Sequence, residues 1–253
     1  MNQPDTDSLT DFGFESVSPA EKTRRVRAVF DSVADRYDLM NDLMSLGLHR
    51  FWKGFLANLA RPSREHPRIL DLASGTGDLV RTLSGAIPHP ACRIASDINF
   101  EMLRRGARKL GEGARFAGVF WVQADAEHLP FADRTFDLVT MAFGLRNVTH
   151  KDAALAEIHR VLRPGGATLI LEFSHPPSQP VQKLYDRYSF AVLPRLGRLI
   201  ARDADSYRYL AESIRRHPDQ STLKRMMEEA GFARVDYFNL SLGIVALHRG
   251  YRL

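Results

Sequence analysis

Several features that would assign the chain to other protein classes are missing. The 253 residues include one cysteine, Cys92, so neither an intrachain disulfide nor a zinc site built from cysteines is available. Apolar runs such as ATLILEF are far shorter than the ~20 residues of a membrane-spanning helix. The first residues, MNQPDTDSLTDFGFES, lack the basic and apolar segments of a signal peptide. We therefore expect a cytoplasmic protein in which residues 1–20 form a disordered tail.

Internal repeats and low-complexity tracts are also absent. Apolar residues make up 44% of the chain and charged residues 26%, as in an ordinary globular protein. The length suits one well-buried domain, which we expect to span residues 21–253.

Positive charge is unevenly distributed. The net charge is +5, yet residues 1–20 carry −4, whereas residues 21–64 and 181–216 each carry +4. The central residues 65–180 are balanced. A basic excess confined to two segments indicates that they approach something anionic, either a membrane surface or a nucleic acid.

Strands and helices alternate through the middle of the chain. Nearly continuous apolar runs predict strands, and amphipathic segments predict the helices between them. The predicted strands are 68–73, 92–98, 119–125, 136–143 and 167–173, and the predicted helices are 78–86, 100–110 and 152–162. Such alternation predicts a mostly parallel sheet with both faces covered, and right-handed crossovers make it a doubly wound α/β fold.

Two segments flank or interrupt this alternation. Residues 21–64 are predicted to form a helical cover with a break at Gly47, because their apolar residues recur at helical spacing. The same spacing within residues 174–219 predicts a helical insertion that forms a lid over the strand ends. A helix at 220–230 and two closing strands follow, and the two strands are predicted to form an antiparallel edge.

The stretch ILDLASGTGDLV leads from the first of these strands into a helix through a glycine loop. Ligands of such sheets bind beyond the carboxyl ends of the strands, and glycine lets the backbone approach them closely. The dinucleotide fingerprint G-x-G-x-x-G is incomplete, since Val80 replaces its third glycine, and no Lys-Ser/Thr pair completes a P-loop. Asp78 at the helix start would also repel a pyrophosphate.

Acidic residues end the next two predicted strands. SDIN places Asp97 where a carboxylate is able to bind the ribose diol, and ADAEHLPF places Asp125 beside the small Ala126, within reach of an adenine amino group. With FDLVTMAF and LRPGGATLILEF following in order, the whole set resembles the class I S-adenosylmethionine-dependent methyltransferases. This resemblance implies a seven-stranded, Rossmann-like sheet whose last strand is antiparallel.

The sequence outside these motifs resembles one family within that class. VADRYDLMNDLMSLGLHRFWK, FGLRNVTHKDAALAEIHRVLRPGG and GIVALHRGYRL are similar to the ubiquinone/menaquinone biosynthesis C-methyltransferase family. The resemblance implies methylation of the ring of a polyprenyl quinol: 2-polyprenyl-6-methoxy-1,4-benzoquinol, demethylmenaquinol or both. It implies no metal, and contacts to S-adenosyl-L-methionine from Gly75, Thr76, Gly77, Asp97, Asp125, Ala126 and Ala142. Ala142 stands where family members can carry a serine, so only a backbone contact is expected there.

The chemistry requires a nucleophilic ring carbon and in-line geometry, and ionisation of the neighbouring hydroxyl activates the carbon. Arg146 and Asn147 follow the fourth predicted strand, next to the expected methyl position. A guanidinium stays protonated at neutral pH, so we predict that Arg146 stabilises the phenolate or acts through a water that Asn147 helps to hold. Tyr37, Asn41 and His49 in the N-terminal cover are further candidates for substrate binding, and a histidine is able to accept a proton near neutral pH.

Other functions and partners stay open. A nucleic-acid methyltransferase is disfavoured, because AFGLRN stands where base N-methyltransferases often carry (N/D)PP(Y/F). The alternatives are a methyltransferase for another phenolic or lipid substrate, and a non-catalytic scaffold in a quinone-biosynthesis complex. Basic residues of the lid suit an anionic lipid surface, so we expect peripheral contact with the inner face of a membrane. These residues are Lys183, Arg187, Arg195, Arg198, Arg202 and Arg208. The quinone branch, tail length, general base, protein partners and oligomeric state are not determined by the sequence.

Overall fold

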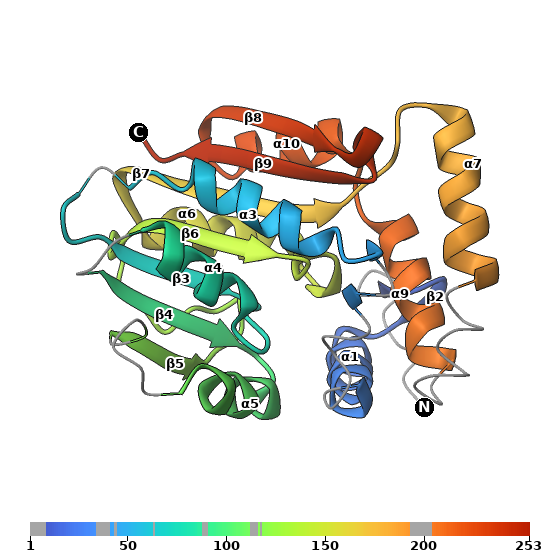
Figure 1. The fold of residues 1–253 in the computed structure, drawn as a ribbon, viewed down its shortest axis with the longest axis horizontal. Coiled ribbons are helices and arrows are strands. Elements are labelled where there is room, and N and C mark those ends of the chain that lie inside the picture. Colours follow the sequence, from blue (N-terminus) through green and yellow to red (C-terminus); the bar gives the residue numbers. More distant parts are fainter. Residues whose placement is uncertain are drawn as a thin grey trace.

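The centre of the protein is a seven-stranded sheet with the strand order β5-β4-β3-β6-β7-β9-β8 (Figure 1). A computed structural model of the chain describes residues 9–33, 41–42, 45–62, 64–87, 91–111, 116, 118–192 and 204–253. The strands are β3 (Arg68–Leu72), β4 (Cys92–Asp97), β5 (Val119–Gln123), β6 (Phe136–Ala142), β7 (Leu162–Phe173), β8 (Ala233–Leu240) and β9 (Val245–Tyr251). Neighbours pair in parallel except at β9, which is antiparallel to both β7 and β8. The predicted doubly wound sheet with an antiparallel last strand is therefore confirmed.

The pairing register aligns the carboxyl ends of the central strands. Leu72 at the end of β3 pairs with Ser96 of β4 on one side and with Met141 of β6 on the other. The residues that follow these strands therefore meet at one edge of the sheet, as is usual for ligand sites in this architecture.

Helices cover both faces of the sheet. The described helices are α1 (Pro19–Val33), α3 (His49–Leu59), α4 (Asp78–Ala86), α5 (Phe100–Leu110), α6 (Lys151–Val161), α7 (Gln179–Arg187), α9 (Ala204–Arg216) and α10 (Gln220–Glu229), of which α3, α4, α5, α6 and α10 lie on the faces (Figure 1). Consecutive strand residues point to opposite faces, so Ile69 joins the apolar cluster under α3 and α4, whereas Leu70 joins the cluster under α6 and α10. No helix in this part of the chain is both long and apolar enough to cross a bilayer.

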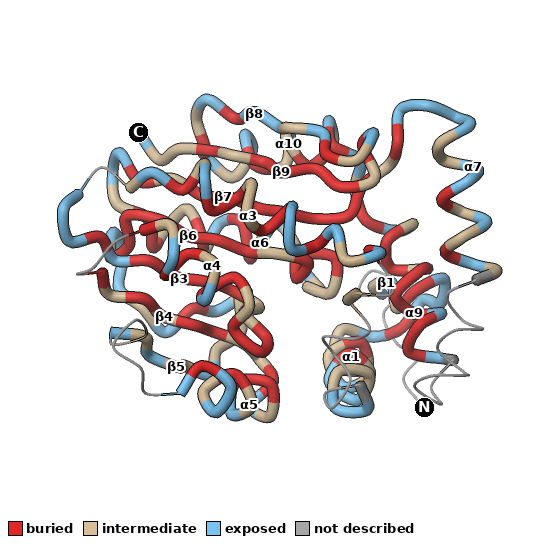
Figure 2. The backbone as a smooth tube through the Cα atoms, in the orientation of Figure 1, coloured by how far each residue is buried: buried red, intermediate tan, exposed pale blue. Residues whose placement is uncertain are grey.

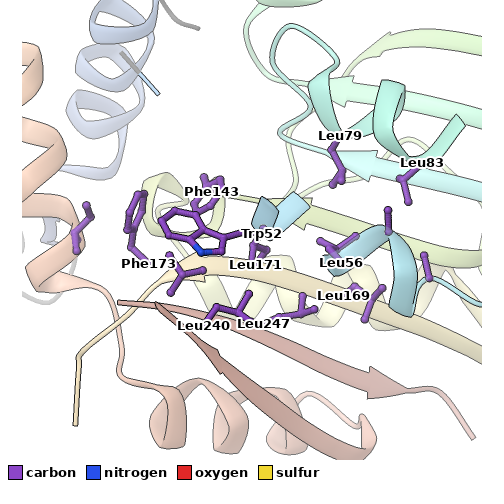
Figure 3. Close-up of a cluster of buried hydrophobic side chains, with 14 of the residues drawn as sticks. Trp52, Leu56, Leu79, Leu83, Phe143, Leu169, Leu171, Phe173, Leu240 and Leu247 are labelled. Carbon is purple, nitrogen blue, oxygen red and sulfur yellow. The ribbon is translucent and has the colours of Figure 1, made fainter. Parts of the chain in front are cut away.

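Trp52 of α3 anchors the first of these clusters (Figure 3). Its side chain is 1% exposed and packs against the rings of both Phe143 and Phe173, with centroid distances of 6.0 and 6.1 Å. The indole N–H donates to Ser241 Oγ at 2.9 Å, which satisfies its only polar group. Trp52 is therefore a core residue of the cover and is not exposed to a substrate.

Elements outside the alternating pattern gather at the carboxyl edge of the sheet (Figure 1). They are α1, α7, α9 and a hairpin of β1 (Thr10–Phe12) and β2 (Glu15–Val17). Burial is concentrated in the sheet and in α9, whereas α7 projects and is exposed along much of its length (Figure 2).

The prediction that residues 1–20 form a disordered tail is wrong for the part of this segment that the structure describes. Residues 10–17 form the β1–β2 hairpin and α1 begins at Pro19, while residues 1–8 lie outside the described part. Each strand has only three residues and little alternation, so its stability comes from packing on distant elements. The Phe12 ring stacks on Tyr209 of α9 at 4.2 Å, and the Phe14 N–H donates to Glu212 of the same helix.

The other predicted boundaries hold within a few residues, with one extension. Strand β7 begins at Leu162, which pairs with Phe136, and residues 163–166 form an irregularity before the pairing with β6 resumes at Ala167. The predicted break at Gly47 is a turn in which this glycine has φ +77°.

Candidate functional site

A cavity of about 860 Å³ lies along the carboxyl ends of β3, β4, β5 and β6. Helix α1 contributes Thr23, Val26 and Phe30 to its lining, so this helix closes it from above the sheet edge. The predicted residues Gly75, Asp97, Asp125, Ala126 and Asn147 all line it.

The glycine loop connects β3 to α4 through left-handed backbone. Gly75 and Gly77 have φ angles of +54° and +79°. A Cβ on Gly77 would lie 2.7 Å from the Trp121 ring, so this position requires glycine for packing against β5. Gly75 lines the cavity, whereas Gly77 lies behind it as the N-cap of α4.

The ends of β3 and β6 approach each other closely beside this loop. Ala73 and Phe143 both have left-handed backbone, with φ +49° and +60°, although neither is a glycine. A Cβ on Gly144 would lie 2.4 Å from the Cβ of Ala73, so no larger residue fits there. Strained backbone of this kind is typical of functional sites.

Asp97 links the glycine loop to β4. Its carboxylate accepts hydrogen bonds from the backbone N–H groups of Gly75 (2.9 Å) and Asn99 (2.8 Å). Burial raises the pKa of Asp97, and the backbone donors oppose that rise. A carboxylate has about four lone-pair positions. Two remain for the hydroxyls of a ribose after these two bonds.

Asp125 occupies the equivalent position after β5. Its Oδ1 accepts the Glu127 N–H at 2.9 Å, which holds the carboxylate at the cavity wall beside Ala126. The arrangement is compatible with the predicted contact to an adenine amino group, which stays a prediction.

A second cavity of about 350 Å³ lies on the other side of Ala73 and Phe143. Its lining includes the predicted residues Thr76, Ala142 and Asn41. It also includes Asp71, a residue that the sequence reasoning did not select although it is the aspartate of ILDLASGTGDLV. A charged residue inside an apolar strand was the signal available for it.

Asp71 is 2% exposed, and only one of its two carboxylate oxygens has a hydrogen-bond partner among the described residues. Its Oδ1 accepts the Thr140 hydroxyl at 2.6 Å, while its buried Oδ2 has no hydrogen-bond partner. Burial raises the pKa of Asp71 to about 7, against the effect of the Thr140 bond. An unpartnered buried carboxylate oxygen beside a cavity suits a cationic group, so these residues fit a ligand such as S-adenosyl-L-methionine.

Arg146 follows β6 in a short 3₁₀ turn, η4 (Leu145–Asn147). Hydrogen bonds to Glu172 and Phe143 fix its side chain. Its Nη1 donates to Glu172 Oε1 at 2.9 Å and to the Phe143 carbonyl at 2.5 Å, and its backbone N–H donates to Glu172 Oε2. Both side chains are buried, 5% and 1% exposed. Arg146 is not among the cavity-lining residues, so its predicted contact with a phenolate stays a prediction.

Asn147, the next residue, does face the cavity. Its Oδ1 accepts the hydroxyl of Tyr209 from α9 at 3.1 Å. Neither Glu172 nor Tyr209 was selected from the sequence. A lone glutamate in the apolar run ATLILEF was a usable signal for Glu172, whereas nothing local points to Tyr209.

The remaining candidates lie in the N-terminal cover. His49 is 5% exposed, and its Nε2 lies 2.8 Å from Asp42 Oδ1. Burial lowers the pKa of His49, and it lines neither cavity. Tyr37 lies outside the described residues.

The chain is similar to known proteins over nearly its whole length. The model of the ubiE/COQ5 methyltransferase family matches residues 18–252. The chain is 55% identical over 243 residues to the "Ubiquinone/menaquinone biosynthesis C-methyltransferase UbiE" of Escherichia coli and to that of Shigella boydii, covering 96% of each chain.

Solved structures support the fold. A methyltransferase from Thermotoga maritima, described as S-adenosylmethionine-dependent, has a TM-score of 0.63 at 18% identity, covering 89% of this chain and 99% of its own. One from Aquifex aeolicus has a TM-score of 0.53 at 16% identity, covering 94% of this chain and 100% of its own.

Proposed function

This chain belongs to the ubiE/COQ5 methyltransferase family, and from that premise we propose that it methylates a ring carbon of a polyprenyl quinol. Its cofactor is S-adenosyl-L-methionine, which supplies an electrophilic methyl group on a positively charged sulfur. The observation that carries the substrate proposal is the 55% identity, over 96% of both chains, to a protein named for C-methylation in quinone biosynthesis. The cavity supports it, because its wall combines strand-end carboxylates with the amide of Asn147.

In this proposal the cofactor lies along the parts of the two cavities that the aspartates line, and the quinol lies at the Asn147 end of the large cavity. Asp97 and Asp125 accept hydrogen bonds from its adenosine part, and Asp71 balances its positive charge. Ala73 and Phe143 lie between Asp71 and the other two aspartates, since both residues line both cavities.

The transfer needs a phenolate and precise alignment, and no covalent catalysis. The quinol hydroxyl loses its proton, and its electron density moves to the neighbouring ring carbon. A carbon–carbon bond forms to the methyl group while the carbon–sulfur bond breaks and leaves its electron pair on the sulfur. The ring carbon then loses its proton to water, which in turn restores the hydroxyl on the ring oxygen. Asn147, with Arg146 behind it, supplies polar groups on the acceptor side, and the apolar side chains of Phe30, Phe143 and Val148 limit water there.

A turnover assay with methyl-labelled S-adenosyl-L-methionine tests the proposal. A short-tailed demethylmenaquinol and a methoxybenzoquinol are offered separately, each as the quinol and as the oxidised quinone. We expect label on a ring carbon of the quinol alone, since a quinone has no hydroxyl to ionise, and the preferred ring identifies the branch. Arg146→Ala is expected to lower this turnover.

Two other outcomes would each contradict the proposal. Label on another phenolic or lipid substrate, with none on either quinol, would identify a different small-molecule methyltransferase. Cofactor binding without transfer to any acceptor would favour a non-catalytic scaffold in a quinone-biosynthesis complex.

The proposed contact with an anionic membrane rests on exposed basic residues of the lid. Lys183 and Arg187 are exposed on the projecting α7, while Arg208 on α9 lies 3.5 Å from Asp205. Each basic residue near such a surface contributes about 1 kcal/mol. We expect sedimentation with phosphatidylserine vesicles that weakens in Lys183→Glu/Arg187→Glu and at high salt; absence of binding to such vesicles would refute this contact.

A further inference from the structure

Asn147 is held by a side chain from a different part of the chain. The hydroxyl of Tyr209, 62 positions further along, donates to Asn147 Oδ1 at 3.1 Å. Tyr209 is 4% exposed, and its ring stacks on Phe12 of the N-terminal hairpin with an interplanar angle of 17°. Three segments that are distant in sequence therefore meet at the Tyr209 side chain.

The hydrogen bond determines which end of the carboxamide is available. An asparagine side chain has one acceptor oxygen and one NH₂ group with two donors. Because Tyr209 occupies the oxygen, the NH₂ group is left, and Nδ2 has no hydrogen bond to any residue that the structure describes. Asn147 lines the large cavity, so this donor is the group available to a bound oxygen.

Tyr209 is suited to act as a permanent donor. Burial raises the pKa of its hydroxyl well above the ordinary value, with smaller and opposing effects from Arg146 and Glu172, so the hydroxyl keeps its proton at any physiological pH. Its position is fixed by Phe12 on one side and by the packing of α9 on η4 on the other. Rotation of the carboxamide by 180° would take the acceptor oxygen away from the buried phenol O–H, which has no other hydrogen bond to a residue that the structure describes, so this bond disfavours presenting that oxygen to the cavity.

We propose that Tyr209 is a positioning residue: it orients Asn147 so that the carboxamide NH₂ donates to the quinol oxygen as that oxygen becomes negatively charged. This inference rests on the proposed function. The two neighbouring polar residues of η4 are then each held by a different side chain. Glu172 accepts a hydrogen bond from Arg146, and Tyr209 donates one to Asn147. Without the Tyr209 hydroxyl, the carboxamide is free to turn its oxygen toward the developing phenolate, which raises the energy of the transition state.

A double-mutant cycle separates this role from simple packing. Tyr209→Phe keeps the ring and its stacking on Phe12 but removes the hydroxyl. We expect kcat to fall about tenfold, the size of one hydrogen bond, and the pH at which kcat is half-maximal to rise because the phenolate is less stable. The Kd of S-adenosyl-L-methionine is expected to be unchanged. In an Asn147→Ala background, Tyr209→Phe should have no further effect on kcat.

Tyr237→Phe is the matched control, since Tyr237 lies on β8 and is 37% exposed. It should leave kcat and its pH profile unchanged. A tenfold loss from Tyr209→Phe that persists in the Asn147→Ala background would overturn the proposal, as would an unchanged pH profile.

A second measurement does not depend on the acceptor. In ¹⁵N-labelled protein, the side-chain NH₂ signals of Asn147 are assigned by their loss in Asn147→Ala. We expect them to shift and broaden in Tyr209→Phe, because the carboxamide gains rotational freedom. Unchanged signals would overturn the positioning role even if the wild type methylates no quinol, and an inactive wild type with shifted signals would contradict only the proposed substrate.

Discussion

The two ends of the site are built in different ways. At the cofactor end, Asp97 is held by the N–H groups of Gly75 and Asn99, which are 22 and 2 positions away, and all three stand in consecutive strand–loop–helix units. At the acceptor end, Asn147 is held across 62 positions by Tyr209, and Arg146 is held across 26 positions by Glu172. The cofactor end is thus a product of local sequence, while the acceptor end depends on the docking of separate elements.

The contrast has a chemical counterpart. Backbone donors hold the carboxylate at the cofactor end, so its geometry follows from the fold of the loop. Side chains hold the acceptor end, where rotamers and lid position decide the geometry. We expect changes at the cofactor end to alter affinity for S-adenosyl-L-methionine, and changes at the acceptor end to alter stability and turnover.

Glu172→Ala should have the largest effect on stability. It leaves the Arg146 guanidinium buried without its carboxylate, and removing one partner of a buried ion pair costs about 3–5 kcal/mol. Urea unfolding measures this loss, with Glu229→Ala as the control because that carboxylate belongs to an exposed pair with Arg225. A loss no greater than in the control would show that the Arg146–Glu172 pair does not hold the acceptor end together.

Asp71→Asn should change how stability depends on pH. In the folded protein burial raises the pKa of Asp71 to about 7, whereas the ordinary pKa of an aspartate, taken for the unfolded chain, is 3.8. Between these values folding takes up a proton, so the stability of the wild type declines as the pH rises and levels off above pH ~7.

The variant does not titrate at this position and should lack that decline. Its unfolding free energy relative to the wild type should therefore increase by roughly 3 kcal/mol from pH 5 to pH 8. The test is a series of urea titrations without cofactor. Parallel pH curves for the two proteins would mean that Asp71 is ionised at neutral pH.

Asp97→Ala should weaken binding of S-adenosyl-L-methionine about 100-fold, because the diol loses its acceptor and the Gly75 N–H loses its partner. Calorimetric titration measures the effect, and Asp133→Ala, an exposed carboxylate paired with Arg160, is the control. The free energy of unfolding should fall less than in Glu172→Ala. Asp97→Ala removes a buried carboxylate, whereas Glu172→Ala leaves the buried Arg146 charge without its partner. Unchanged affinity would be inconsistent with the ribose contact.

Asp31→Ala should have the smallest effect. Asp31 accepts the Asn99 Nδ2–H group at 2.8 Å and thereby fastens α1 across the large cavity. Losing this bond should weaken cofactor binding about fivefold, through faster dissociation measured by stopped flow. An equal change in turnover at saturating cofactor would indicate that α1 serves the acceptor end as well.

Much of the fold was predictable from local signals. Helices α4 and α5 have the predicted bounds, 78–86 and 100–110, because amphipathic spacing, glycine and an asparagine N-cap mark them in the sequence. The hairpin at residues 10–17 was missed, because its three-residue strands are stabilised by α9 and have no strong pattern of their own.

The candidate site divides in the same way. Gly75, Asp97 and Asp125 were predictable because each follows a recognisable strand, and parallel strands place their carboxyl ends at one edge. The long-range partner of Asn147 was not, because Tyr209 on α9 carries no mark of the residue it will contact.

The sequence by itself therefore determined the order of the strands and helices, the glycine loop and the acidic strand ends, since these depend on spacing along the chain and on the handedness of crossovers. Only the tertiary structure decided that Glu172 neutralises Arg146, that Asp71 is buried with one oxygen unpartnered, and that Tyr209 orients Asn147. The physical reason is that burial and polar pairing arise when distant elements dock, and local patterns do not encode those contacts.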